Sequence, residues 1–500
     1  MLIALGVACT EADGDGADEL GDTGSTSGDG STSGDGSTSG DGSTSGDGST
    51  SGDGSTSGDG STSGDGSTSG DGSTSGDGST SEDGSSEGDE STGEPACTAT
   101  GFAALPVIWD IPPSVKPASF GSGLCAPYSY MTLDLDGDGS IELVATDNCD
   151  DQTSLGEGQW WVYENTGDGF APIPTIWATP PSTGTPNVGY CTPYADVLLD
   201  LNGDGLLDLA AVDDCVNGTM MGAGQWLVWE NTGEGFAPTP TIWTTPTSAG
   251  ALNLGYCDPY ADMVMDMNGD ELPELVAVTD CGGPEALGEG EWWIYENTGT
   301  GFAPSPMSWP TPPNVGALNI GYCDPYADTL MDLDGDGLLD LVAVSDCDEP
   351  APLGEGEWWS YKNTGSGFAP LASAWSTPAD VGALNSGYCD PYTDAVLDID
   401  GDGELELVVT GDCDTQSPLG DGEWWVYDNT GSGFANPPTI WSTPAVVHAG
   451  SIAGSTCDPY IYGVRDLDGD GLVDLVVTGD CDSQTELGES YWRVYLGECE

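Results

Sequence analysis

A long internal repeat is the feature that most restricts how this chain can fold. Six copies follow one another, and each contains two cysteines at the same separation. The six pairs are Cys125 and Cys149, Cys191 and Cys215, Cys257 and Cys281, Cys323 and Cys347, Cys389 and Cys413, and Cys457 and Cys481. These positions give a period of about 66 residues, which is typical of a solenoid or a propeller, where each repeat is one unit packed on its neighbours.

Each repeat contains four short stretches that favour β-strands, separated by turn residues. In the repeat that begins at Cys323 they are 326–333, 339–346, 356–364 and 367–375, and the last is interrupted by a proline, as suits an edge strand. Four short antiparallel strands per repeat are typical of a propeller blade, whereas independent β-sandwiches need roughly 100 residues each. The sequence therefore predicts an all-β, six-bladed β-propeller of four-stranded blades, with a seven-bladed ring as the alternative.

The two ends of the repeat region predict a closed ring. The last repeat stops after "YWRVYLGECE" and lacks a fourth strand, whereas "GFAALPVIW" at 101–109 matches the fourth-strand pattern "GFAPTPTIW" at 235–243. We expect the N-terminal segment to complete the last blade, which would remove free sheet edges. Closure would also bring Cys97 near Cys499, and we expect a disulfide between them.

An acidic nine-residue window, D-x-D-x-D-x-x-x-D/E, lies between the first two strands of every repeat; we call it the acidic loop and number its positions 1 to 9. Oxygens at positions 1, 3 and 5, a carbonyl at 7 and a carboxylate at 9 can converge on one calcium ion, and glycines allow the tight turn. We therefore expect up to six Ca²⁺ ions; the alternative is a solvated turn without metal. Blade three has Glu271 in place of a glycine, and also Pro273, so we expect it to bind weakest. The expected ligands, in blade order, are Asp134, Asp136, Asp138 and Glu142; Asp200, Asn202, Asp204 and Asp208; Asp266, Asn268, Asp270 and Glu274; Asp332, Asp334, Asp336 and Asp340; Asp398, Asp400, Asp402 and Glu406; and Asp466, Asp468, Asp470 and Asp474.

The paired cysteines flank each acidic loop symmetrically. Cys323 and Cys347 are equally far in sequence from Gly335, and the other blades keep this symmetry. Because residues equidistant from a hairpin's centre face each other, we expect one disulfide in each blade. Free thiols or a zinc array are the alternatives. Fourteen of the fifteen cysteines fall into seven expected pairs, which indicates an oxidising compartment.

Composition excludes several partners. The chain has 86 acidic and 4 basic side chains, so we expect it to bind neither nucleic acid nor an anionic membrane surface. The start "MLIALGVACT" is similar to the end of a bacterial lipoprotein signal, with Cys9 as the lipidated residue and residues 1–9 as a possibly truncated signal; an ordinary secretory signal is the alternative. Residues 10–96, which include nine copies of "STSGDG", predict a disordered linker. We expect a monomer outside the cell or on its surface, as an outer-membrane lipoprotein.

The repeats resemble a known family. "DLDGDGLLDL" followed by "WWVYENTGDGFAP" is similar to the FG-GAP-like repeat of the VCBS type, which includes the calcium-loop blades of the integrin α-subunit propeller. The resemblance covers about residues 97–500. It implies a β-propeller with Ca²⁺ in the acidic loops and recognition on the opposite face. The integrin ring has seven blades, and the paired cysteines are not part of the general pattern.

The expected opposite face carries the repeated stretch "GYCDPYAD". Its tyrosines and aspartates could stack on sugar rings and accept hydrogen bonds, and the candidate ligand-binding residues are Tyr256, Asp258, Tyr322, Asp324, Tyr388 and Asp390. Alternatively, these tyrosines cover blade junctions and the aspartates stabilise turns. The tryptophan doublets, such as Trp292 and Trp293, are expected to pack blades together.

Two classes of function follow from this pattern. We expect a binding or adhesion module for a surface glycan or protein, without catalytic residues, because the repeats are strongly alike and a catalytic site usually breaks repeat symmetry. An extracellular polysaccharide hydrolase or lyase is one alternative, and a purely structural surface protein is another. His448, Arg465 and Lys116 break the symmetry near the ring's closure and mark where an asymmetric site would lie.

Overall fold

The computed structural model describes residues 99–112, 128–148, 155, 158–180, 194–214, 224–246, 252, 260–280, 287, 290–312, 326–346, 353, 356–379, 384, 392–412, 419–420, 422–444, 460–480, 487–488 and 490–499. By its contacts the chain divides into two units, Met1–Thr92 and Gly93–Glu500, and every described residue belongs to the second. The described residues form strands and turns without helices, and accordingly include no helix able to span a membrane.

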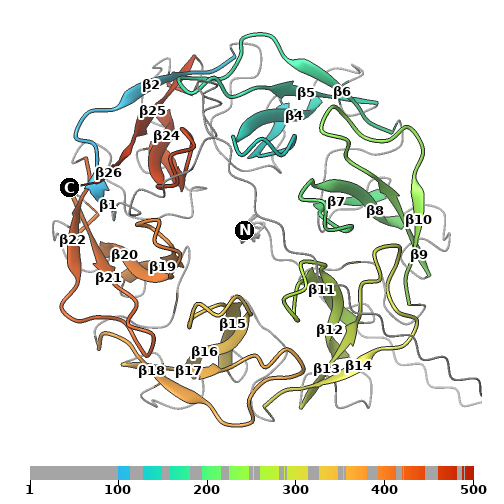
Figure 1. Cartoon of the computed structure of the whole chain (residues 1–500). Helices are drawn as coiled ribbons and strands as arrows, with labels where there is room; N and C mark the ends of the chain where they lie inside the picture. The colour runs from blue at the N-terminus through green and yellow to red at the C-terminus, as the bar shows by residue number, and fades with distance from the viewer. Residues whose placement is uncertain are drawn as a thin grey trace, which may run out of the picture. The chain divides into compact units, whose positions relative to one another are not determined.

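The described strands form six sheets arranged in a closed ring (Figure 1). In blades one to five the strands follow one another in chain order, with the first strand toward the centre of the ring and the fourth at its rim. The predicted six-bladed propeller is confirmed, and the seven-bladed alternative is wrong. The strands of blades one to five are β3 (Tyr128–Leu133), β4 (Glu142–Asn148), β5 (Gln159–Tyr163) and β6 (Thr175–Ala178); β7 (Tyr194–Leu199), β8 (Asp208–Asp214), β9 (Gln225–Trp229) and β10 (Thr241–Thr244); β11 (Tyr260–Met265), β12 (Glu274–Asp280), β13 (Glu291–Tyr295) and β14 (Met307–Pro310); β15 (Tyr326–Met331), β16 (Asp340–Asp346), β17 (Glu357–Tyr361) and β18 (Ser373–Ser376); and β19 (Tyr392–Leu397), β20 (Glu406–Asp412), β21 (Glu423–Tyr427) and β22 (Thr439–Ser442).

The second strand of each blade forms the centre of the core. In β12, Leu275, Val276, Ala277 and Val278 are all buried, because this strand lies between two others and its faces meet both neighbouring blades. A strand buried on both faces has a continuous apolar sequence rather than an alternating one. This is why the Val/Leu-rich run that follows each acidic loop is apolar at nearly every position.

The fourth strands are shorter than the sequence predicted. In blade four the expected strand is 367–375, whereas β18 begins at Ser373 and ends at Ser376. The segment before it crosses to blade three instead, where the backbone amide of Phe368 donates a hydrogen bond to the carbonyl oxygen of Pro310 at 3.0 Å. Residues 367–372 therefore connect blade four to blade three and do not form part of β18.

The ring closes as predicted. Blade six consists of β23 (Tyr460–Arg465), β24 (Asp474–Asp480) and β25 (Tyr491–Tyr495), and its fourth strand is β2 (Val107–Asp110) from the other end of the repeat region. β2 runs antiparallel to β25, with Val107 opposite Val494 and Trp109 opposite Trp492. A strand supplied by one end of the chain to a blade built by the other removes the free sheet edge that an incomplete blade would expose.

A second pairing at the closure was not predicted. β1 (Ala99–Phe102) pairs antiparallel with β26 (Gly497–Cys499) and meets β22 of blade five, where Gly101 lies opposite Ser442. The predicted single strand over 101–109 is therefore split by a turn into β1 and β2. Ala99 lies opposite Cys499. Cys97 lies outside the described residues, so the disulfide between Cys97 and Cys499 stays a prediction.

Neighbouring blades are held together by a repeated aromatic contact. Phe236, which precedes the fourth strand of blade two, packs edge-on against Trp160 and Trp177 of blade one, with ring centroids 5.3 and 5.7 Å apart. Phe102, Phe170, Phe302, Phe368 and Phe434 each meet two tryptophans of the preceding blade in the same way. Edge-on aromatic pairs are favourable beyond their buried area. The prediction that the tryptophan doublets pack blades together is confirmed by Trp292 and Trp293, which lie in the two cores on either side of blade three.

Candidate metal centres

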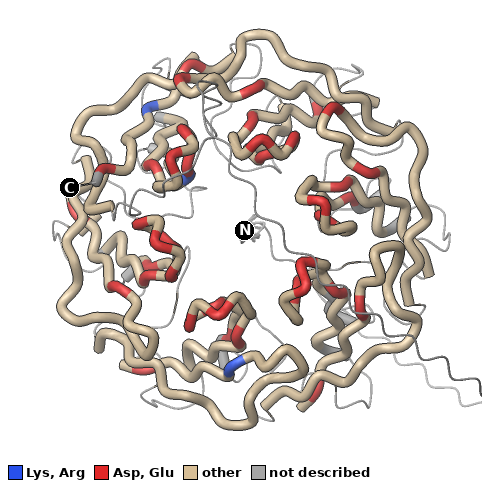
Figure 2. Tube along the Cα trace, viewed as in Figure 1, with Lys and Arg blue, Asp and Glu red and all other residues tan. Residues whose placement is uncertain are grey.

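The six acidic loops join the first and second strands and lie at the inner ends of the blades, where acidic residues gather (Figure 2). The carboxylate at position 1 organises the loop. In blade one, Asp134 accepts hydrogen bonds from the backbone amides of Gly137 at 2.7 Å and Gly139 at 3.1 Å. Both glycines have positive φ angles, 79° and 91°. These contacts turn the loop tightly enough to bring its alternate side chains together.

Blade three keeps this turn without its second glycine. Glu271 has a φ of 70° and is the one non-glycine residue with a positive φ among the described residues. Asp266 still accepts hydrogen bonds from the amides of Gly269 at 2.7 Å and Glu271 at 2.9 Å. The loop therefore has the same shape as the others, but a residue with a side chain is held in a conformation that favours glycine.

The acid at position 9 begins the second strand and is almost fully buried in every blade. Its exposed fraction is 2% or less at Glu142, Asp208, Glu274, Asp340, Glu406 and Asp474. Burial raises the pKa of all six, assisted by the neighbouring loop carboxylates: to about 8 at Glu142, about 9 at Glu406, about 7 at Glu274, Asp208 and Asp474, and about 6 at Asp340. A buried carboxylate beside other carboxylates is unfavourable unless a proton or a cation compensates its charge.

The position-9 acids alternate around the ring between glutamate and aspartate, and their hydrogen-bond partners differ. The glutamates reach back to their own loop: Glu142 accepts from the backbone amide of Leu135 at 2.9 Å. The aspartates accept from the segment after the third strand, as Asp208 does from the amide of Asn231 at 2.9 Å. Asp474 does both, since it accepts from Gly497 and also from Leu467 of its own loop, each at 3.0 Å. The second oxygen of Asp208 is buried and has no hydrogen-bond partner among the described residues. This oxygen is free to coordinate a cation.

Four loops bring three carboxylates together so that their oxygens lie within 4.8 Å of one another. The groups are Asp134, Asp136 and Glu142; Asp332, Asp334 and Asp336; Asp398, Asp400 and Glu406; and Asp466, Asp468 and Asp474. Blades two and three have Asn202 and Asn268 at position 3, where an amide oxygen replaces a carboxylate. Every donor is an oxygen, and such a set could hold a hard divalent cation.

Close packing of the loop acids also affects position 3. The pKa of Asp136 and of Asp468 is raised, and that of Asp400 is raised to about 6, first by burial and also by the adjacent carboxylates. A bound divalent cation would offset both effects, since its charge favours the ionised form of the carboxylates.

One repeated asparagine that the sequence analysis missed links the loops of adjacent blades. The side-chain amide of Asn231 donates to the carbonyl oxygens of Leu207 in its own loop at 3.1 Å and Leu135 in the loop of blade one at 2.7 Å. Asn165, Asn297, Asn363 and Asn429 make the same pair of contacts. Blade six has Gly497 at this place, within β26, and β26 pairs with β1 in the sheet of blade five. The sequence pattern that could have revealed this asparagine is the tripeptide "NTG", which recurs shortly after the third strand in blades one to five.

Several expected residues lie outside the described part of the chain. They are Cys9 and Cys97, the twelve cysteines of the six blade pairs, the candidate ligand-binding residues Tyr256, Asp258, Tyr322, Asp324, Tyr388 and Asp390, and also Lys116 and His448. Lipidation, the disulfides and the ligand face therefore stay predictions.

The argument for the blade disulfides needs one correction. The register shifts between Ala327 and Asp328 because the second strand has one extra residue there. Tyr326 therefore lies opposite Asp346, although Asp346 is further in sequence from Gly335 than Tyr326 is. Equal spacing from the loop centre therefore does not place Cys323 directly opposite Cys347. Their spacing still predicts a pair within one hairpin, but not by direct opposition.

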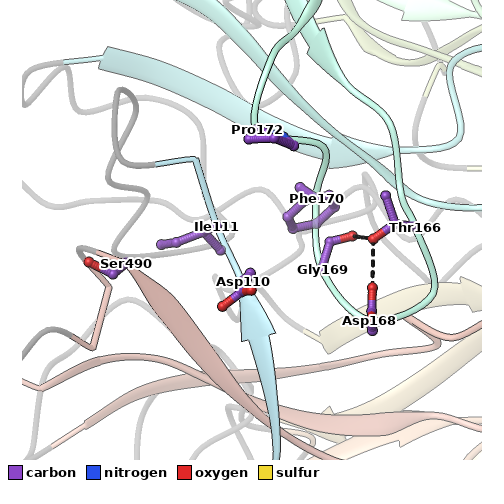
Figure 3. A pocket seen from close by; sticks show the side chains of 8 residues that line it. All are labelled: Asp110, Ile111, Thr166, Asp168, Gly169, Phe170, Pro172 and Ser490. Atoms are coloured by element: carbon purple, nitrogen blue, oxygen red, sulfur yellow. Dashed lines mark hydrogen bonds between the residues drawn. The ribbon is translucent and has the colours of Figure 1, made fainter.

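A pocket of about 420 Å³ lies where blade six meets blade one (Figure 3). Eight residues line it: Asp110, Ile111, Thr166, Asp168, Gly169, Phe170, Pro172 and Ser490. Asp110 and Ser490 depart from the repeat. At the position of Asp110 the other five blades have an uncharged residue, and at the position of Ser490 they have glycine. Arg465 ends β23 and does not line it. Thr166 donates a hydrogen bond to Asp168 at 3.0 Å, and no basic side chain is among the eight.

The fold is a six-bladed β-propeller, and one span of its repeats is similar to a known repeat family. The family model described as "FG-GAP-like repeat" matches residues 332–409, which run from the acidic loop of blade four into the second strand of blade five. The resemblance stated from the sequence is therefore confirmed over this span.

Comparison with solved structures finds similar chains at low sequence identity. A Photorhabdus luminescens Tc holotoxin pore is 19% identical, with a TM-score of 0.46 over 78% of this chain and 15% of that one. An Agrocybe aegerita lectin that recognises non-reducing terminal N-acetylglucosamine is 20% identical, with a TM-score of 0.42 over 71% of this chain and 75% of the lectin. The chain thus spans a small part of the holotoxin chain and about three quarters of the lectin. No curated protein matches the sequence.

Proposed function

We propose that this chain is a calcium-stabilised β-propeller that acts outside the cell as a binding module. The observation that carries the proposal is the buried acid at position 9, present in all six loops and at most 2% exposed. A solvated Asp/Gly turn has no need for a carboxylate in the protein interior. A cation site does, because a ligand shielded from water holds the ion from the side of the core.

The donor set favours calcium over the other common metals. Calcium takes six to eight oxygen ligands in flexible geometry, whereas zinc prefers nitrogen and sulfur. Carboxylates at positions 1, 3 and 9 and amide oxygens at Asn202 and Asn268 fit this preference. When bound, the ion supplies two positive charges to a group of carboxylates that otherwise repel one another.

The chain's own residues would transmit this stabilisation around the ring. Position 1 organises the turn, position 9 belongs to the second strand, and the asparagine that follows the third strand joins two loops. Fixing one loop therefore restrains two strands of its own blade and the loop of the preceding blade. We infer a rigid ring whose opposite face is free to present side chains to a ligand.

A binding role fits the repeat better than a catalytic one. Each blade carries the same loop and the same aromatic contacts, and the pocket at the closure is lined by acids without a basic partner. We propose that the tyrosines and aspartates of the "GYCDPYAD" stretches bind a surface glycan or protein, and that the N-terminal linker tethers a monomer to the cell surface. A polysaccharide hydrolase or lyase is the competing proposal.

Metal binding is tested on metal-stripped full-length protein. Native mass spectrometry should show several Ca²⁺ ions per chain at micromolar free calcium, and calcium should raise the melting temperature more than magnesium at the same concentration. An unchanged melting temperature together with no bound ion would falsify the calcium proposal.

Ligand binding is tested on a glycan array with the calcium-loaded protein. Binding that is lost in Tyr256→Ala and Tyr322→Ala but kept in Ile242→Ala, an exposed rim substitution, supports the binding role. Release of new reducing ends from a polysaccharide panel would instead establish the enzymatic alternative.

A further inference from the structure

The acidic loop of blade four already holds a positive charge from the chain itself. The ammonium group of Lys362 contacts a carboxylate oxygen of Asp334 and lies 2.9 Å from an oxygen of Asp336. These are positions 3 and 5 of the loop, and each belongs to the group of carboxylates that could hold a metal. Lys362 follows β17, so it reaches the loop from outside the hairpin.

This lysine reverses the charge that the repeat carries at the same place. In blades one, two, three and five, the third strand is followed by an acid directly before the asparagine that links the loops. These acids are Glu164, Glu230, Glu296 and Asp428. Only four basic residues occur in the whole sequence. One of these four, Lys362, replaces the acid beside the loop of blade four. It contacts Asp334 and Asp336, which are expected calcium ligands.

The carboxylates of blade four are also arranged differently. In blades one, five and six, the group within 4.8 Å includes the buried acid at position 9, whereas in blade four it consists of positions 1, 3 and 5. Asp340, at position 9, accepts hydrogen bonds from the backbone amide of Asn363 at 2.7 Å and the hydroxyl of Ser360 at 3.4 Å. Lys362 thus lies on the open side of the loop, with positions 3 and 5 turned toward it and position 9 outside the group.

We propose that the ammonium group of Lys362 serves as the resident cation of the acidic loop in blade four, so that this loop is the last of the six to bind calcium. The proposal rests on calcium being the ligand of the other loops. An ion entering blade four must displace the ammonium from Asp334 and Asp336. The side chain of Lys362 is 49% exposed and can move into solvent, so displacement costs only what two partly solvated ion pairs contribute.

This arrangement gives blade four a loop whose charge is compensated without calcium. Two exposed ion pairs of up to about 1 kcal/mol each lower the calcium affinity by up to about thirtyfold, relative to the loop with a neutral residue at this place. The sequence alone suggested blade three as the weakest site because of Glu271 and Pro273. Blade three has no competing cation among its described residues, so we place it ahead of blade four in the order of loading.

The test compares calcium stoichiometry in Lys362→Met, which removes the charge and keeps the stem, with wild type. Native mass spectrometry is performed over a series of free calcium concentrations. The final ion should bind at roughly tenfold lower calcium in Lys362→Met than in wild type. Lys116→Met is the matched control, because it makes the same change in net charge at a different place, and it should load like wild type.

A reciprocal variant keeps the proposal falsifiable if Lys362→Met folds poorly. Glu164→Lys places a lysine beside the acidic loop of blade one, and the protein should then have two late-binding ions instead of one. Equal loading of wild type, Lys362→Met and Glu164→Lys would overturn the proposal about Lys362 while leaving calcium binding intact. Absence of bound calcium from all of these proteins would instead overturn the proposed function on which it rests.

Discussion

The side-chain amide of Asn231 donates a 2.7 Å hydrogen bond to the carbonyl oxygen of Leu135, 96 residues earlier in the chain and in the neighbouring blade. The same amide also binds the carbonyl oxygen of Leu207, so one buried side chain satisfies a carbonyl in each of two acidic loops. Five such asparagines connect the loops around most of the ring. The loops therefore form one connected structure and not six separate hairpins.

Replacing this asparagine should destabilise the ring more than an ordinary surface substitution does. Asn231→Ala leaves two buried carbonyl oxygens without donors, and we expect a loss of about 2 to 3 kcal/mol in the free energy of unfolding. Asn231→Asp should be at least as damaging, because it places a carboxylate oxygen against the same carbonyls. Chemical denaturation of the calcium-loaded protein measures both. A loss no larger than that of Ile242→Ala would show that the asparagine contributes little.

The buried acids predict an unusual dependence of stability on pH in the metal-free protein. Because the folded-state pKa of Glu406 and Glu142 is raised to about 9 and about 8 from 4.5, the folded chain binds more protons than the unfolded chain between these values. Their contribution to stability is complete below about pH 4.5 and is lost as the pH rises toward 8 to 9. The melting temperature of metal-stripped protein should therefore fall from pH 5 to pH 9.

Calcium should remove most of this dependence, because the ion binds the ionised form that high pH favours. Scanning calorimetry of metal-stripped and calcium-loaded protein across this range measures the difference. Glu406→Gln is a matched variant, since it keeps the shape of the side chain and cannot ionise; it should flatten the metal-free profile. A metal-free melting temperature that rises with pH would contradict the raised pKa values.

Glu271 predicts a stabilising substitution. Its φ of 70° is costly for any residue with a Cβ, and Glu271→Gly should raise the free energy of unfolding by about 1 kcal/mol. Glu271→Ala separates conformation from charge, because it removes the carboxylate and keeps the Cβ. Thermal denaturation should place Glu271→Gly above Glu271→Ala; equal stability of the two would show that the backbone is not strained.

The aromatic contact between blades predicts a large loss on truncation. Phe236 is 7% exposed and packs between two tryptophans of blade one, so Phe236→Ala should cost about 3 to 5 kcal/mol through lost contacts and a cavity. Phe236→Leu fills more of the space and should cost less. Denaturant titration checks the order. A Phe236→Ala protein as stable as wild type would mean that the blades do not depend on this contact.

Much of the fold could be predicted because its determinants are local and repeated. A strand of the ELVAVTD type, a turn and a Trp-rich strand recur at a fixed period, so a pattern that is ambiguous once becomes decisive when it occurs six times. The ring closure was predicted for the same reason, since "GFAALPVIW" at 101–109 matches a pattern seen elsewhere in the chain. The pairing of β1 was not, because it depends on β26 and β22, which approach from other parts of the ring.

The candidate ligands follow a similar division. Positions 1, 3, 5 and 9 lie within one short window of sequence, so a tight loop was enough to predict that their oxygens converge. The burial of position 9, the hydrogen bonds of its aspartates to the segment after the third strand and the place of Lys362 could not be predicted, because each depends on groups outside the loop. Asp334 and Lys362 are 28 residues apart in sequence and meet only because β15, β16 and β17 bring their ends to one side of the blade.

The sequence by itself determined the number of blades, the closure of the ring and the identity of the acids in each loop, because short-range geometry and sixfold repetition specify all three. Only the tertiary structure decided which acid is buried, which asparagine joins two loops and which loop contains a cation from its own chain. Those properties arise where separate segments pack together and exclude water, and no spacing within a single segment encodes them.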